Sequence, residues 1–253
     1  MSLLADSVLL RPYVFIFLLA FVVAAVRDIG PRRAGLFMAW LGPMAFVAEL
    51  MSTRIGIPFG LYHYTGTTRG QELYIADVPF FDPLSFVFLA YAAFCLARVV
   101  CLKSRASLHS RAPGLRPPAR VLRAGELLRL AVLSGVLMML LDVVIDPLAV
   151  RGDRWFLGRV FWYPHGGVYF GVPLSNFGGW VIVGALGVGG YLRRGGVAAI
   201  GRSPALGVGL YYGVLAFNLA MTAWIGEWAL LTAGLVVHIV LAAGLVSARR
   251  FAG

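Results

Sequence analysis

The sequence predicts an all-α integral membrane protein, a bundle of about seven transmembrane helices. Of its 253 residues, 60% are hydrophobic and only 13% are charged, and the mean hydropathy is +0.84. A soluble domain of this length could not keep so much apolar surface from water, whereas a bilayer core of about 30 Å requires helices of about 20 apolar residues. The apolar stretches are continuous rather than alternating, which favours helices over the strands of a barrel.

Seven stretches are long and apolar enough to cross the bilayer. They are residues 8–26, 34–52, 83–101, 127–145, 174–192, 205–225 and 227–247. The first lacks a basic start, and its arginines follow it, so we expect it to remain in the protein rather than to act as a cleaved signal. Only Gly226 separates the last two stretches, which predicts a tight helical hairpin.

The distribution of positive charge, with a net charge of +11, predicts the orientation. Basic residues concentrate in loop 27–33, segment 102–124, loop 193–203 and the C-terminal tail, which are alternate connections. Because basic loops stay in the cytoplasm, we expect the N-terminus outside and the C-terminus in the cytoplasm of a multi-pass cell-membrane protein. Segment 102–124 is expected to be a basic cytoplasmic linker within a single membrane domain of residues 1–253. The charge suits anionic lipid and does not indicate nucleic-acid binding.

Acidic residues gather at the outer end of the predicted bundle. Nine of the eleven lie there: Asp6, Glu49, Glu72, Asp77, Asp82, Asp142, Asp146, Asp153 and Glu227. Glu49, Asp142 and Asp146 lie in apolar spans, where ionisable groups are costly and usually functional. Asp142 and Asp146 are four residues apart and therefore share a helix face. These three carboxylates are the candidate catalytic residues.

Carboxyl groups in such a setting suit general acid catalysis. Burial and like-charge proximity would keep at least one of them protonated at neutral pH. Asp142, the deepest, is the expected proton donor, while Asp146 and Glu49 are expected to stay ionised and to accept a proton. The alternative is that the carboxylates only fix helix ends by pairing with arginines. The available partners are Arg54, Arg151, Arg154 and Arg159.

Aromatic residues and glycines are dense in the outer connections. Residues 56–64 read GIPFGLYHY and residues 161–180 read FWYPHGGVYFGVPLSNFGGW. An interfacial aromatic belt explains part of this composition, but the clustered glycines also indicate close backbone approach. The candidate substrate-binding residues are Tyr62, Tyr64, Trp162, Tyr163, Tyr169, Asn176, Trp180 and Asp82.

Other membrane chemistries lack their required residues. A retinal protein needs a lysine within a span, and the only lysine, Lys103, lies in the expected cytoplasmic segment. Di-iron hydroxylases need many closely spaced histidines, and this chain has four scattered ones. No metal and no cofactor are therefore expected.

Four motifs resemble one known family. They are ELMSTRIGIPFGLYHY at 49–64, the Asp77-Val78-Pro79 triplet, Leu141-Asp142 through Asp146-Pro147, and YFGVPLSNFGGW at 169–180. Together they are similar to the membrane-bound carotenoid biosynthesis proteins of the carotenoid 1,2-hydratase (CruF-type) family, which includes γ-carotene and bisanhydrobacterioruberin hydratases. The resemblance covers about residues 40–185, and its most specific part is the last motif.

The resemblance implies a hydro-lyase that works without a cofactor. Its implied reaction is the addition of water to the terminal double bond of an acyclic carotenoid end group, with the carotenoid dissolved in the bilayer. Membrane lipid and other carotenoid biosynthesis enzymes are the implied partners. Two alternatives stay open: a protonation-initiated carotenoid or isoprenoid cyclase, which needs the same residues, and a non-enzymatic carotenoid-binding or transport protein.

Overall fold

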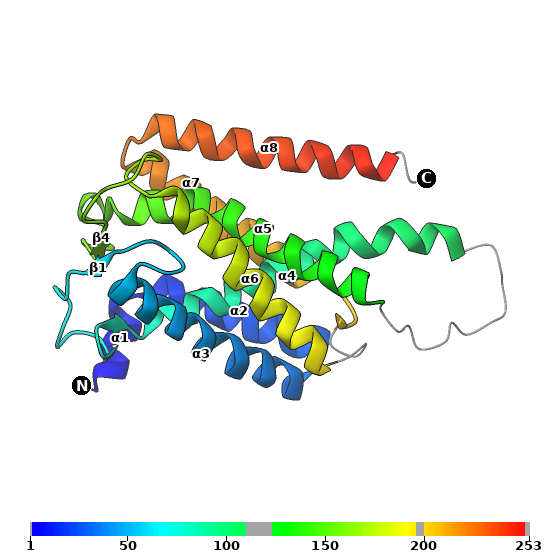
Figure 1. Ribbon diagram of the computed structural model, residues 1–253, viewed down its shortest axis with the longest axis horizontal. Helices are drawn as coiled ribbons and strands as arrows, with labels where there is room; N and C mark the ends of the chain where they lie inside the picture. The colour runs from blue at the N-terminus through cyan, green and yellow to red at the C-terminus, as the bar shows by residue number, and fades with distance from the viewer. Residues whose placement is uncertain (1, 110–122, 196–199, 251–253) are drawn as a thin grey trace.

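The protein is a bundle of long helices with two short two-stranded antiparallel sheets at one end (Figure 1). The computed structural model describes residues 2–109, 123–195 and 200–250. The helices are α1 (Leu3–Leu10), α2 (Pro12–Ile29), α3 (Pro31–Ile55), α4 (Phe81–His109), α5 (Ala124–Ala149), α6 (Leu174–Gly195), α7 (Ala205–Trp224) and α8 (Trp228–Arg250), with a 3₁₀ turn at Gly152–Arg154. The strands are β1 (His63–Tyr64), β2 (Tyr74–Ile75), β3 (Val78–Pro79) and β4 (Phe161–Trp162), and they form the sheets β1–β4 and β2–β3.

The predicted all-α membrane fold is confirmed. Helices α2 to α8 follow the seven predicted stretches in order. Within the described residues, five of them (α2, α3, α4 as far as Cys101, α5 and α7) are long and apolar enough to cross a membrane, while Trp228–Gly244 of α8 is a shorter apolar helix. The orientation of the bundle stays a prediction.

Two predicted boundaries need correction. The first stretch does not begin as one continuous helix, because the chain breaks at Arg11 between α1 and α2. Pro12 lacks an N–H group and its ring disfavours continuation of a preceding helix. The expected linker 102–124 begins later than predicted, since α4 continues to His109, and its residues 110–122 lie outside the described part of the chain.

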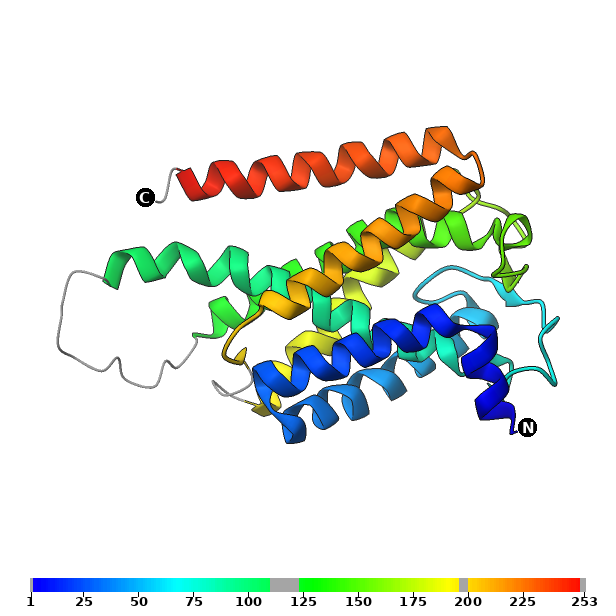
Figure 2. The same cartoon turned by 180° about the vertical axis from the view of Figure 1, so that it is seen from behind.

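Helix α4 forms the centre of the bundle. It contacts α2, α3, α5, α6 and α7, whereas α8 packs on α5 and α7 at the edge (Figures 1 and 2). Helices α5 and α6 make the most extensive contact, and glycines allow it. A Cβ atom on Gly135 would lie 2.2 Å from the carbonyl oxygen of Val181, so only glycine permits this close approach, as is common between membrane helices.

The end of the bundle opposite the two small sheets is held by a buried ion pair. Arg98 of α4 pairs with Asp28 at the end of α2, and both side chains are at most 4% exposed. The Tyr91 hydroxyl donates to Asp28 Oδ2 at 2.9 Å, and the Ser203 backbone N–H, just before α7, donates to Asp28 Oδ1 at 2.7 Å. This end therefore fastens α2, α4 and the start of α7 together.

Candidate active site

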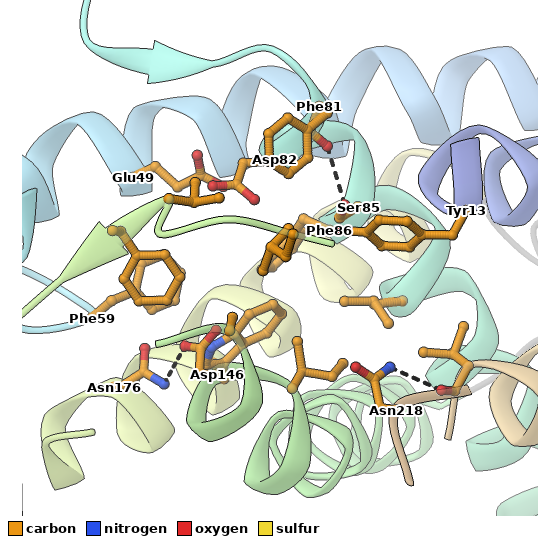
Figure 3. Close-up of a pocket in the computed structure, with 18 of the residues that line it drawn as sticks. Tyr13, Glu49, Phe59, Phe81, Asp82, Ser85, Phe86, Asp146, Asn176 and Asn218 are labelled. Carbon is orange, nitrogen blue, oxygen red and sulfur yellow. Dashed lines mark hydrogen bonds between the residues drawn. The ribbon is translucent and has the colours of Figure 1, made fainter. Parts of the chain in front are cut away.

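A cavity of about 130 Å³ lies at the end of the bundle that carries the two small sheets (Figure 3). Helices α2 to α7 and the β1–β4 sheet all contribute to its wall. Its carboxyl groups are Glu49 from the end of α3, Asp82 from the start of α4 and Asp146 from the end of α5. The rest of the wall is mainly aromatic: Tyr13, Phe17, Phe59, Tyr62, Tyr64, Phe81, Phe86, Phe88, Trp155, Phe161, Tyr163, Trp180 and Phe217.

Glu49 and Asp82 share one tyrosine hydroxyl. Tyr64 Oη lies 2.5 Å from Asp82 Oδ2 and 3.1 Å from Glu49 Oε2. Burial, and then the neighbouring Asp82 and Glu49 carboxyls, raise the pKa of Tyr64 well above its usual value, so it stays a neutral hydroxyl. A hydroxyl has one hydrogen to donate. The geometry is therefore satisfied when one carboxyl accepts that hydrogen and the other is protonated.

Asp142 and Asp146 share one amide. Asn176 Nδ2, on α6, donates to Asp142 Oδ2 at 2.6 Å and to Asp146 Oδ2 at 2.8 Å. Trp180 and Asp146 both line the cavity. Asp142 is fully buried and lies deeper than Asp146, as expected, but it does not line the cavity. Asn176 therefore links Asp146, which lines the cavity, to Asp142, which does not.

These four carboxyls have no cationic partner within the described residues. Arg54 instead pairs with Asp77, with its Nη2 3.0 Å from Asp77 Oδ1, and Arg151 and Arg154 both pair with Glu227. The alternative in which arginines neutralise Glu49, Asp142 and Asp146 to fix helix ends is therefore wrong for the described part of the chain. Close carboxyls without a cation favour shared or retained protons.

The register of the antiparallel β1–β4 sheet determines which aromatic residues face the cavity. His63 is opposite Trp162, and Tyr64 is opposite Phe161. Side chains alternate along a strand, so Tyr64 and Phe161 line the cavity while the Trp162 side chain is 40% exposed beside His63. The expected role of Trp162 in the pocket is thus not supported by its position.

The remaining predicted binding residues divide clearly. Tyr62, Tyr163 and Trp180 line the cavity, as do Asn176 and Asp82. Tyr169 does not: it packs edge-on against Phe170 and Phe177, with centroid distances of 4.8 and 5.3 Å. Tyr169 is half-buried, in a loop that closes tightly where Gly167 meets the backbone of Val172.

Several lining residues were not predicted from the sequence. Tyr13 and Phe17 come from α2, Phe86 from α4, and Phe217 and Asn218 from α7. Tyr13 and Phe17 have the four-residue spacing of one helix face, and Asn218 is a lone amide in an apolar span, a pattern that often marks function. Phe86 stacks on Trp180 with centroids 5.3 Å apart and planes 18° apart. No sequence signal identifies that pairing.

The fold and the cavity define a multi-pass α-helical membrane protein with an acidic, aromatic pocket at one end of its bundle. The sequence model of the family described as "Carotenoid biosynthesis protein" matches residues 11–241. This chain belongs to the carotenoid biosynthesis protein family, and the resemblance seen in its motifs is confirmed.

A curated relative supports this membership. The chain is 32% identical to the bisanhydrobacterioruberin hydratase of Haloarcula japonica over 192 residues, which cover 74% of this chain and 56% of that relative. The match thus spans little more than half the length of the relative. No solved structure gives a significant match.

Proposed function

We propose that this protein is a carotenoid biosynthesis enzyme of the cell membrane that adds water to the terminal double bond of an acyclic carotenoid end group. The observation that carries the proposal is the placement of three carboxyl groups, Glu49, Asp82 and Asp146, on the wall of one aromatic cavity. Figure 3 shows Glu49 and Asp82 in its upper part, Asp146 and Asn176 in its lower part, and Phe86 between them. The relative named as a hydratase supports the same reaction.

Glu49 is the proton donor in this proposal. The short 2.5 Å contact from Tyr64 Oη to Asp82 has the length of a hydrogen bond to an ionised carboxylate. Tyr64 then donates its single hydroxyl hydrogen to Asp82. The longer 3.1 Å contact between Tyr64 Oη and Glu49 Oε2 suits a protonated Glu49. This assignment replaces Asp142, which does not reach the cavity wall.

Protonation of the terminal alkene produces a tertiary carbocation. The proton of Glu49 forms a C–H bond with the less substituted alkene carbon, and the π electrons supply that bond. The positive charge left on the dimethyl-substituted carbon can lie against aromatic faces, which stabilise cations by about 2 kcal/mol when desolvated. The stacked Phe86 and Trp180 rings provide such a face beside Asp146.

Asp146 is the proton acceptor in this proposal. It receives a hydrogen bond from the Asn176 amide at 2.8 Å, and a donor of this kind favours the ionised form of a carboxyl group. Water attacks the carbocation to form the C–O bond, and Asp146 takes the proton that this water releases. The product is a tertiary alcohol, and the cycle closes when one proton returns from Asp146 to Glu49.

Expression in a host that accumulates lycopene or γ-carotene tests the reaction. Pigments are extracted and analysed by mass spectrometry, with an empty vector as control. A product heavier by one water, about 18 mass units, is the expected result. An unchanged mass with a shifted absorption spectrum would instead identify a cyclase, and recovery of unaltered pigment bound to purified protein would identify a binding protein; either outcome contradicts the hydratase proposal.

A further inference from the structure

The cavity is too small for a whole carotenoid. In proteins, an apolar cavity of about 150 Å³ holds one benzene molecule, and this cavity measures about 130 Å³. It has room for a branched end group of about six carbons, whereas most of a C40 chain has to remain outside. If the proposed function is right, the polyene must leave the cavity through a gap between helices.

The carboxyl groups of the cavity wall lie away from the side that α2 and α7 form. In the close-up, Glu49 and Asp146 lie toward the left, and Tyr13 and Asn218 lie at the right (Figure 3). The Asn218 amide uses one of its two N–H groups within its own helix, on the Val214 carbonyl at 2.9 Å. The other α2 and α7 side chains in the wall are Tyr13, Phe17, Val214 and Phe217, and none of them carries a charge. The wall formed by α2 and α7 is therefore the one suited to a hydrocarbon chain.

Helices α2 and α7 diverge toward the cavity end of the bundle (Figure 2). Aromatic rings fill the space between them. Tyr13 of α2 stacks on Phe217 of α7, with centroids 5.1 Å apart and planes 17° apart, and Phe17 meets Phe217 edge-on at 5.7 Å. Phe156 contacts Tyr13 at 5.7 Å and is 49% exposed. The rings thus continue from the cavity wall to the outer surface.

The seam between α5 and α6 contrasts with this arrangement. There, a Cβ atom on Gly184 would lie 2.9 Å from Gly135 Cα, so the two backbones are in contact and leave no space for a chain. A seam held by side chains can open through rotamer changes, whereas a seam of touching backbones requires the helices to separate.

We propose that the seam between α2 and α7 is the lateral entry of the polyene chain, with Tyr13, Phe17 and Phe217 as its gate and Phe156 at its mouth. This inference rests on the proposed function for the identity of the chain that it admits. Flat aromatic faces suit a flat conjugated polyene, and the stacked Tyr13–Phe217 pair is the element that the polyene displaces. The end group then reaches Glu49 and Asp146 while the chain stays in the lipid.

Photocross-linking in a carotenoid-accumulating host tests the entry site without requiring turnover. The photoreactive residue p-benzoylphenylalanine is placed at Phe156, which is 49% exposed at the mouth, so that the gate keeps its own rings. The matched control places it at Leu186 of α6, which is 64% exposed. We expect a pigment adduct of the protein at position 156 and much less at position 186. An adduct yield at position 156 no higher than at position 186 would overturn the proposal.

A size change on α7 provides the second test. Phe217→Trp should overfill the gate and lower the hydration rate by about tenfold or more, since overpacking of a filled site is costly. Ala220→Trp, on the exposed face of the same helix, should leave the rate unchanged. A native rate in Phe217→Trp would contradict the gate. Labelling at position 156 in a protein that yields no hydrated pigment would refute the proposed function and leave the entry site standing.

Discussion

Replacement of Glu49 by glutamine separates the proposed proton donor from the other carboxyls. Glutamine keeps the shape of the side chain, and its amide can still contact Tyr64, which lies 3.1 Å from Glu49 Oε2. It cannot deliver a proton to carbon. Because a positioned general acid contributes about 10²–10⁴-fold, Glu49→Gln should lower the hydration rate by that factor, which is about 2.7–5.4 kcal/mol in the activation free energy.

The assay follows hydrated pigment per unit of protein in isolated membranes, with immunoblotting to normalise for expression. Asp77→Asn is the matched control, because Asp77 lies at the same end of the bundle in a partly exposed pair with Arg54, and it should retain the native rate. Asp142→Asn should be less damaging than Glu49→Gln, since Asp142 acts only through Asn176. A Glu49→Gln protein within threefold of the native rate, or an Asp142→Asn protein that is the more impaired, would refute the assignment.

Three further predictions address the pocket, the stability and the orientation. Trp180→Ala should lower the hydration rate at least tenfold through loss of the ring beside Asp146, whereas Trp162→Ala should not, because Trp162 faces outward; equal rates would contradict the inward–outward assignment. Arg98→Ala should destabilise the protein by about 3–5 kcal/mol, since it leaves a buried carboxylate unpaired, and thermal unfolding in detergent measures the loss. A cysteine at Ser107, in a chain without native cysteines, should resist an impermeant thiol reagent in intact cells, and ready labelling would reverse the orientation.

The helices were predictable because a membrane makes them a local property of the sequence. Each needs a run of apolar residues long enough to span the hydrocarbon core, and such runs can be read without knowing their neighbours. The grouping of the acids was predictable for a related reason, since the ends of successive spans alternate between two sides. Glu49, Asp82 and Asp146 therefore had to lie at the same end, and the structure places all three on one cavity.

The inner arrangement of the site was not predictable, because it depends on pairings between distant segments. The register of the β1–β4 sheet places Tyr64 opposite Phe161, and only that register shows that Trp162 faces away from the cavity. Asn176 separates Asp142 from the cavity although Asp142 and Asp146 share a helix face. The stacking of Tyr13 on Phe217 joins residues from α2 and α7. None of these contacts leaves a periodic signal in the sequence.

Helix α2 behaves as a beam that is clamped at both ends. The buried Asp28–Arg98 pair holds one end. At the other end Arg11, the residue before α2, pairs with Glu72 at 3.3 Å, with both side chains at most 1% exposed, and donates a hydrogen bond to the Leu157 carbonyl. A tilt of α2 away from α7 would therefore break a buried ion pair. The stacked rings of Tyr13 and Phe217 can instead part through rotation of their side chains, while the backbone of α2 stays in place.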